Sequence, residues 1–280
     1  MIIKKWIKPL VFLTLLLALT LFLPSEPVGS WKAFNPRKTA SIIFALAFIQ
    51  VLGFSAARLL GSRLGAVLAG FFGGLVSSTA TTASLARKSK VSSQQDPEME
   101  TLTFLAATLA MLFEGVAILF WGLQEFHYSL FLIFVGPILF TALILFLLSR
   151  KSTDRHLKIE SSPLDILPIL KLSVFIIVIL LLSEILQKVF GKSGLLVFTF
   201  LVSLFEIHGS IIANIQLHNA DTFNVLLLGS LLAISVAASY LSKLFLIFTL
   251  GSSALKSQAI KYTSMLFLSL IVSWLVFLFI

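Results

Sequence analysis

Three ionisable residues, Glu114, Glu206 and Lys243, lie deep inside stretches that are apolar enough to span a membrane. A charged side chain at the centre of a bilayer costs at least about 2.5–3.5 kcal/mol, so it usually faces a partner or a water-filled cavity. These residues therefore predict a helical bundle with a polar interior, which a transporter, a channel or a membrane enzyme requires.

Glu114 and Lys243 carry opposite charges in the fourth and eighth apolar stretches. We expect them to form an intramembrane ion pair, and pairing of Lys243 with Glu206 is the alternative. A lysine can also extend its ammonium to the membrane interface along an apolar stem, which is a third interpretation for Lys243.

The third apolar stretch is rich in hydroxyl groups, which six of the eight residues from Ser77 to Ser84 carry. The small residues Gly70 and Gly74 suit close packing of helices. Hydroxyls can also bond to the backbone of their own helix, or coordinate a cation or polar solute. Packing and a lined cavity both remain open as predictions. The candidate binding residues are Ser77, Ser78, Thr79, Thr81 and Thr82.

A second polar group surrounds Glu206, because Ser203, Glu206, Ser210 and Asn214 would share one face of a continuous helix. A buried carboxylate there can stay neutral, pair with a cation or carry a proton. His208 is predicted to point roughly the other way, as an interior hydrogen-bonding residue or a proton carrier. Glu206, Ser210 and Asn214 complete the candidate binding residues, and Glu114, Lys243 and His208 are candidates for a charge pair or relay.

The composition predicts an all-α, polytopic transmembrane bundle in a single integral membrane domain, residues 1–280. Of the 280 residues 58% are hydrophobic and 12% charged, the mean hydropathy is +1.05, and a soluble domain carries about 25% charged residues. The apolar runs do not alternate as barrel strands do. Nine spans of about 20 residues are predicted near 9–23, 39–60, 64–86, 101–123, 129–149, 166–190, 194–217, 222–249 and 258–280.

The first span, 9–23, follows Lys4, Lys5 and Lys8 and resembles a signal peptide. No small-x-small cleavage pattern follows closely, so we interpret it as a retained span, with cleavage as the alternative.

The net charge of +9 is attributed to basic loops at anionic headgroups, not to nucleic-acid binding. With nine spans, the basic residues divide nine against ten between the two sides, so the positive-inside rule does not orient the chain. The larger clusters weakly favour an external N-terminus.

A shift of 129 residues indicates an internal repeat from about Arg63 to Gly122. It superimposes Gly65 on Gly194, Thr81 on Ser210 and Glu114 on Lys243. Residues 39–149 would form the first half and residues 166–280 the second. Four spans in each half predict parallel copies.

The sequence contains none of the common catalytic motifs: a Walker loop, an HExxH zinc motif, a GxSxG elbow and a dinucleotide fingerprint are all absent. It has no cysteine, and its acidic residues form no Glu/His metal spacing. Near His127, His156 and His218 the sequence shows no arrangement of acidic and basic residues typical of a catalytic site. We therefore expect no enzymatic activity and no cofactor, and leave a metal site undecided.

The run Gly73-Gly74-Leu75-Val76-Ser77-Ser78-Thr79-Ala80-Thr81-Thr82, with Leu85-Ala86-Arg87-Lys88 after it and Asn35-Pro36-Arg37-Lys38 before the second span, resembles the DUF4010 domain. This is the membrane portion found C-terminal to an MgtC/SapB-type domain in many bacterial and archaeal proteins. The resemblance covers about residues 8–280 and implies a multi-pass protein of the prokaryotic plasma or inner membrane. The family tends to show Asp-Val-Asp where this chain has Glu206-Ile207-His208, and a basic residue where it has Glu114.

These observations favour a transporter or permease-like protein that binds a small ion or polar solute between its two halves. The hydroxyl-rich stretch would then face Glu206. The alternative is a regulatory or structural module without transport, which docks a separate MgtC/SapB-like membrane partner or a second copy of the chain.

Overall fold

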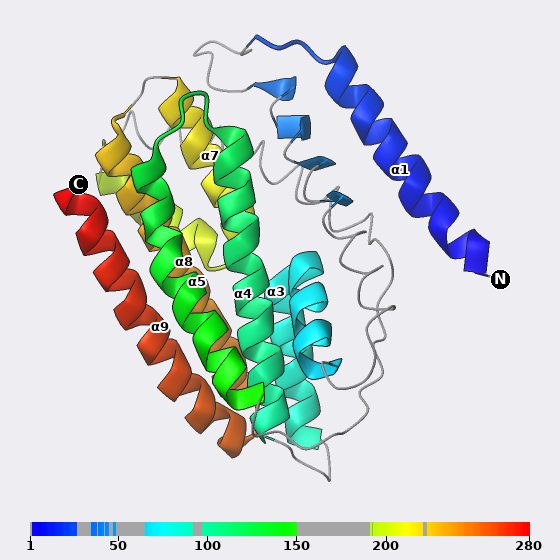
Figure 1. The fold of residues 1–280 in the computed structure, drawn as a ribbon, viewed down its shortest axis with the longest axis vertical. Coiled ribbons are helices and arrows are strands. Elements are labelled where there is room, and N and C mark those ends of the chain that lie inside the picture. The colour runs from blue at the N-terminus through cyan, green and yellow to red at the C-terminus, as the bar shows by residue number, and fades with distance from the viewer. Residues whose placement is uncertain are drawn as a thin grey trace.

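The computed structural model describes residues 2–26, 35–37, 39–41, 43–44, 47–48, 65–91, 97–149, 191, 193–220 and 223–280, which contain helices and no strands. A short apolar helix, Ser193–Ser203, precedes α7. The other helices, labelled in Figure 1, are α1 (Ile2–Phe22), α3 (Gly65–Val91), α4 (Pro97–Gly122), α5 (Tyr128–Ser149), α7 (Ile207–Asn219), α8 (Val225–Leu250) and α9 (Ser253–Phe279).

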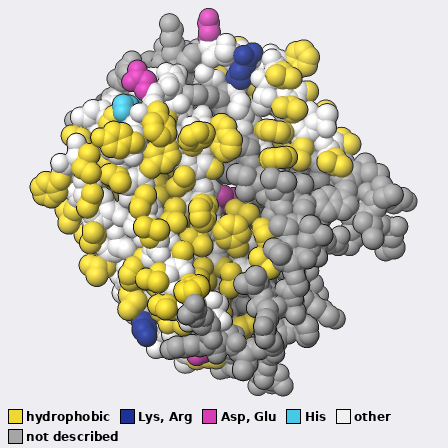
Figure 2. Space-filling model, in the orientation of Figure 1, with side chains coloured by type: hydrophobic (Ala, Val, Ile, Leu, Met, Phe, Trp, Pro, Cys, Tyr) yellow, Lys and Arg dark blue, Asp and Glu magenta, His cyan; other side chains and the backbone are white. Residues whose placement is uncertain are grey.

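Four of these helices, α4, α5, α8 and α9, are long and apolar enough to cross a membrane. Their 22–27 residues rise about 33–40 Å, and a bilayer core is about 30 Å thick. They match the spans predicted at 101–123, 129–149, 222–249 and 258–280. Hydrophobic side chains cover the visible outer face of the described bundle, and charged side chains gather at its two ends (Figure 2).

The predicted span 9–23 falls within α1, which Figure 1 shows at one edge of the molecule. The predicted spans 39–60 and 166–190 lie largely or wholly outside the described residues.

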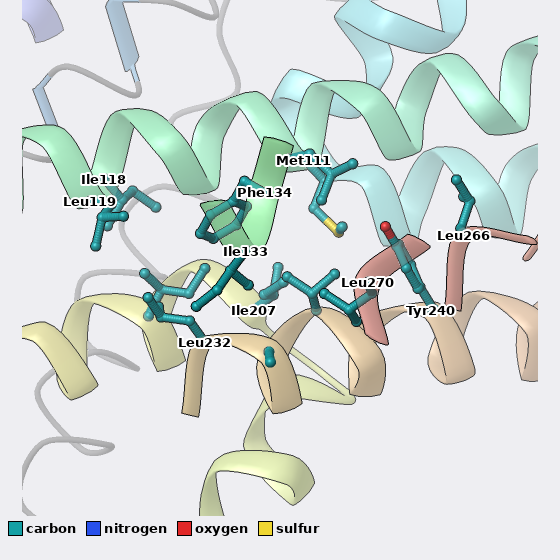
Figure 3. Close-up of a cluster of buried hydrophobic side chains, with 14 of the residues drawn as sticks. Met111, Ile118, Leu119, Ile133, Phe134, Ile207, Leu232, Tyr240, Leu266 and Leu270 are labelled. Atoms are coloured by element: carbon teal, nitrogen blue, oxygen red, sulfur yellow. The ribbon is translucent and has the colours of Figure 1, made fainter. Parts of the chain in front are cut away.

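The helices α4 and α8 form the centre of the bundle. In the apolar segment of α4 72% of the residues are buried, against 28% in α9. Each of the two central helices packs against α3, α5, α7 and α9. Figure 3 shows the apolar core between them, where Met111 and Ile118 of α4 and Leu232 and Tyr240 of α8 meet side chains of α5, α7 and α9. Glu114 of α4 and Lys243 of α8 are therefore held in a packed interior.

The helices α4 and α8 run antiparallel, as contacts at both ends establish. Asn219 Nδ2 donates to the carbonyl oxygen of Gly122 at 2.9 Å, so α7 ends, and α8 begins, beside the end of α4. The backbone N–H of Ser252 donates to Ser89 Oγ at 3.0 Å, so α8 ends near the start of α4. This arrangement, visible in Figure 1, does not fit the predicted parallel halves.

Residues 65–91 form a helical hairpin, because α3 folds back on itself at Ser77. Ser77 has a non-helical backbone (φ −169°, ψ 107°). A Cβ placed on Gly73 would lie 3.7 Å from Thr81 Cβ, whereas eight residues of straight helix would separate them by about 12 Å. The predicted single span 64–86 is therefore corrected to two short arms.

The predicted span 194–217 is also a hairpin. The helix Ser193–Ser203 ends at a turn, and α7 starts at Ile207 after Glu206, whose backbone is extended (φ −149°, ψ 101°). Thr199 Oγ1 donates to Asn214 Oδ1 at 3.3 Å, although fifteen residues of straight helix would place them about 22 Å apart. The 13 residues of α7 rise only about 20 Å, which is too short to cross a bilayer core.

Candidate functional site

The turns of the two hairpins reach α4 at nearly the same depth, from opposite ends of the bundle. Gly74, in the first arm of α3, is so close to α4 that an added Cβ would lie 2.9 Å from Ala110 Cβ. His208, in the first turn of α7, contacts Glu114. Ala110 and Glu114 are four residues apart, which is about 6 Å of helical rise. The hairpins therefore bring their turns to one level inside the bundle.

Each second arm begins with a residue whose side chain caps the new helix. Ser77 Oγ accepts from the backbone N–H of Ala80 at 3.2 Å, and Glu206 Oε1 accepts from the backbone N–H of His208 at 3.1 Å. A helix start leaves N–H groups without partners inside the helix, and side-chain oxygens there satisfy them. Each break is thus stabilised by the side chain of the residue at which it occurs.

His208 lies between two carboxylates. Its Nε2 is 3.1 Å from Glu114 Oε2, and its Nδ1 is 3.2 Å from Glu206 Oε1. The Glu114 contact is at ion-pair distance but lacks hydrogen-bond alignment. Because both nitrogens of an imidazolium are donors, one protonated ring can serve both carboxylates. The sequence had predicted that His208 points away from Glu206, because it assumed one continuous helix.

Lys243 is fully buried in α8 and does not reach an interface. Its ammonium donates to Ser239 Oγ at 2.6 Å and to Met111 Sδ at 2.9 Å. The sequence predicted that Lys243 pairs directly with Glu114 or Glu206, but the described residues contain neither ion pair. The carboxylates of Glu114 and Glu206 contact His208 instead. Lys243 still interacts with both carboxylates through longer-range electrostatics.

Some hydroxyl groups of the stretch from Ser77 to Ser84 stabilise the helix, and others are only half-buried. Ser78 and Thr82 are buried, and Thr82 Oγ1 donates to the Ser78 carbonyl at 2.7 Å, while Ser77 caps its helix. Thr79 and Thr81 are half-buried, and Thr81 packs against Gly73. In the described structure no hydrogen bond joins these residues to Glu206, so their predicted role in solute binding stays a prediction.

Polar groups also line the interior of the second hairpin. Ser210 Oγ is 3.4 Å from Ser235 Oγ on α8. Ser203 Oγ and Asn214 Nδ2 are buried, and neither has a hydrogen-bond partner among the described residues. Buried polar groups are normally satisfied, by water where protein partners are lacking. These two atoms can therefore bind water or a polar solute.

Sequence reasoning missed the partners of Lys243, which are Ser239 and Met111, and the role of Thr199 inside the second hairpin. These contacts were missed because the helix breaks at Ser77 and Glu206 were not predicted. Neither residue is next to a proline or directly follows a glycine, which are the usual sequence signals for a break. The signal that could have found the breaks is the 129-residue shift, which superimposes Ser77 on Glu206. Among the described residues no three His, Cys, Asp or Glu side chains are arranged to hold a metal ion.

No curated protein and no solved structure is significantly similar to the chain. A family model described as "Domain of unknown function (DUF4010)" matches residues 45–251. The match covers about three quarters of the sequence, including both hairpins, Glu114, Glu206 and Lys243. The chain, with its two opposed hairpins and buried charges, is therefore a member of the DUF4010 family.

Proposed function

We propose that this protein is a secondary transporter for a small ion or polar solute, bound where the two hairpins meet. The observation that carries the proposal is that hairpins from opposite ends of the bundle bring their turns to one depth, beside buried Glu114. Non-helical backbone inside a membrane is tolerated where protein buries it or where it lines a water-filled cavity. Broken helices at the midplane form the binding sites of many secondary transporters.

We also infer an inverted repeat, which supports this proposal. Adding 129 to the bounds of α4 gives 226–251, close to α8 at Val225–Leu250. The same shift of α5 gives 257–278, within α9 at Ser253–Phe279. The central helices α4 and α8 have the same four packing partners and run antiparallel. A hairpin does not cross the membrane, so each half would contain three spans, and an odd number inverts the second copy.

The solute site in this proposal lies between the two halves. The first half contributes Ser77, Ser78, Thr79, Thr81 and Thr82, and the second contributes Glu206, Ser210 and Asn214. Glu114 and Lys243 set the charge between them. Taking a charge out of water costs several kcal/mol, and ionisable side chains inside a membrane protein usually belong to a functional site, which supports a role for Glu114, His208 and Lys243.

The test is flux through purified protein in proteoliposomes. The vesicles are loaded with radioactive sodium, rubidium, chloride, phosphate or an amino-acid mixture, and release is followed under an imposed gradient. We expect at least one solute to move faster than in protein-free vesicles. Glu206→Gln should slow this release at least tenfold, whereas Glu125→Gln, at an exposed loop position, should match the wild type.

If none of these solutes moves, the transporter proposal is wrong. If Glu206→Gln instead changes assembly with a co-purifying membrane protein and no solute moves, the docking role predicted as the alternative would be favoured.

A further inference from the structure

We propose that Glu206, His208 and Glu114 form a proton relay that loads and unloads the transporter. This inference rests on the proposed function and names a proton as its coupling ion. It is carried by the continuous chain of contacts Glu206–His208–Glu114, which links the turn of the second hairpin to the central helix α4.

Exposure decreases along this chain of contacts. The side chain of Glu206 is 33% exposed, that of His208 12% and that of Glu114 3%. Glu206 is therefore the most accessible of the three side chains, and among the described residues His208 contacts both carboxylates, so a proton that enters at Glu206 can reach Glu114 through the ring. A side chain with two ring nitrogens is suited to this middle position, because one nitrogen can accept a proton while the other donates one.

The transfer conserves protons at every step. A protonated Glu206 donates its proton to Nδ1 of a ring that carries hydrogen only on Nε2, which leaves a Glu206 carboxylate and an imidazolium. The imidazolium then donates its Nε2 proton to the Glu114 carboxylate and becomes the neutral ring with hydrogen on Nδ1. Unloading reverses these steps: protonated Glu114 returns its proton to Nε2, and the resulting imidazolium returns its Nδ1 proton to the Glu206 carboxylate, which restores the starting tautomer.

The surrounding charges fit a proton better than a metal ion. The helix α7 packs against α4 and α8. Glu114 of α4 and Glu206 at the turn contact His208, and the charged group that α8 contributes to this interior is Lys243, whose ammonium donates to Ser239 and Met111. The charges of the carboxylates Glu114 and Glu206 and of the cations His208 and Lys243 sum to zero when all four are ionised. Uptake of one proton therefore changes the group by a single charge, and the described residues form no cluster of three metal ligands.

The relay can be tested without knowing the solute, by NMR of protein in lipid bilayers with ¹⁵N-labelled histidine and ¹³C-labelled glutamate carboxyls. The chain has only four histidines, so His208→Gln identifies the His208 signals, and Glu→Gln variants identify those of Glu114 and Glu206. We expect the three residues to change signal around shared pH midpoints, because strongly interacting groups titrate as one unit.

Glu114→Gln and Glu206→Gln should each change the proton affinity of His208 at least about tenfold, which is one unit on the pH axis. Glu125→Gln should leave it unchanged. If the His208 signals do not respond to either interior substitution, the relay is overturned whatever the flux assays give. A shared titration in a protein that moves no solute would support the relay and overturn the transporter proposal, so the two failures are distinguishable.

Discussion

Ser77 and Glu206 occupy the same structural position 129 residues apart: each has an extended backbone inside a helical segment and each caps the arm that follows. One of these residues carries a hydroxyl and the other a carboxylate. The two hairpins therefore share a backbone design but differ in charge at the turn. The second hairpin has a carboxylate at its turn, Glu206, and the first has hydroxyl groups there.

The α3 hairpin predicts a disulfide between positions that a straight helix would keep apart. The distance of 3.7 Å between Thr81 Cβ and a Cβ built on Gly73 lies within the disulfide range of about 3.5–4.5 Å. Gly73→Cys with Thr81→Cys should therefore cross-link under mild oxidation, and a mass spectrum of the linked peptide would detect it. The pair Gly73→Cys with Lys90→Cys, about 14 Å further along the second arm, should not. Failure of the first pair to cross-link would contradict the hairpin.

The Glu114–His208 contact predicts non-additive losses of stability. Removing one partner of a buried ion pair costs about 3–5 kcal/mol, because the other charge is left uncompensated. Glu114→Gln and His208→Gln should each lower the unfolding temperature in detergent, and the double variant should lose less than the two single losses together.

The exposed substitution Glu125→Gln is the control for this cycle and should change the free energy of unfolding by less than about 0.5 kcal/mol. Exchange of charges in Glu114→Lys with Lys243→Glu should not restore stability, since these residues are not in contact. Additive single losses, or rescue by the exchange, would refute the His208 pairing.

The hairpins also change the expected orientation in the membrane. Because α3 returns to the side it entered from, Arg87, Lys88 and Lys90 lie at the same end of the bundle as the start of α9, which carries Lys256 and Lys261. Arg37 is the only Lys or Arg that the structure describes near the opposite end. Since cytoplasmic loops are enriched in Lys and Arg, we predict that the α3–α4 connection is cytoplasmic.

This orientation can be read from the labelling of single cysteines, because the natural chain has none. In intact cells a membrane-impermeant maleimide should label Gln124→Cys and not Lys90→Cys, and inverted vesicles should give the reverse. The unmodified chain serves as the background control. Labelling of both positions from the same side would contradict the antiparallel arrangement of α4 and α8.

Gly70 predicts a site where a single methyl group is not tolerated. A Cβ there would lie 2.2 Å from the carbonyl oxygen of Thr103 and 2.8 Å from its Cα, and backbone atoms of α4 cannot rotate away as a side chain can. Overpacking costs about 1–3 kcal/mol, so Gly70→Ala should lower the unfolding temperature. Ser84→Ala, at an exposed position of the same helix, should have little effect, and equal behaviour of the two variants would show that α3 is not packed this closely.

The sequence predicted the membrane class and four of the spans because long apolar runs determine where helices cross. It also identified Glu114, Glu206, His208 and Lys243 as the unusual interior groups, since charge within an apolar run is visible without a structure. It assigned their contacts incorrectly. The prediction that Ser203, Glu206 and Asn214 share one helix face assumed that the helix continues through the turn.

The breaks themselves could not be predicted from local propensity. Serine and threonine occur both in packed membrane helices and at helix starts, so the run after Gly74 did not distinguish the two. The caps are local, but each break also depends on packing against α4, which is a tertiary effect. The prediction of parallel halves depended on the same assumption, because it counted each hairpin as a span, and the parity of the number of predicted spans in a half determines the orientation of the second half.

At Lys243 we expect thermal stability and transport activity to favour different side chains. Its acceptors in the described structure are one hydroxyl and the sulfur of Met111, and a thioether is a weak acceptor. A methionine at this position would fill nearly the same volume without a charge. Since Lys243 contacts no carboxylate among the described residues, the substitution would break no ion pair and would remove the desolvation cost of a buried ion, which is several kcal/mol. Lys243→Met should therefore give a more heat-resistant protein that has lost its flux, so tolerance to heating is a poor guide to whether a variant of this protein still works.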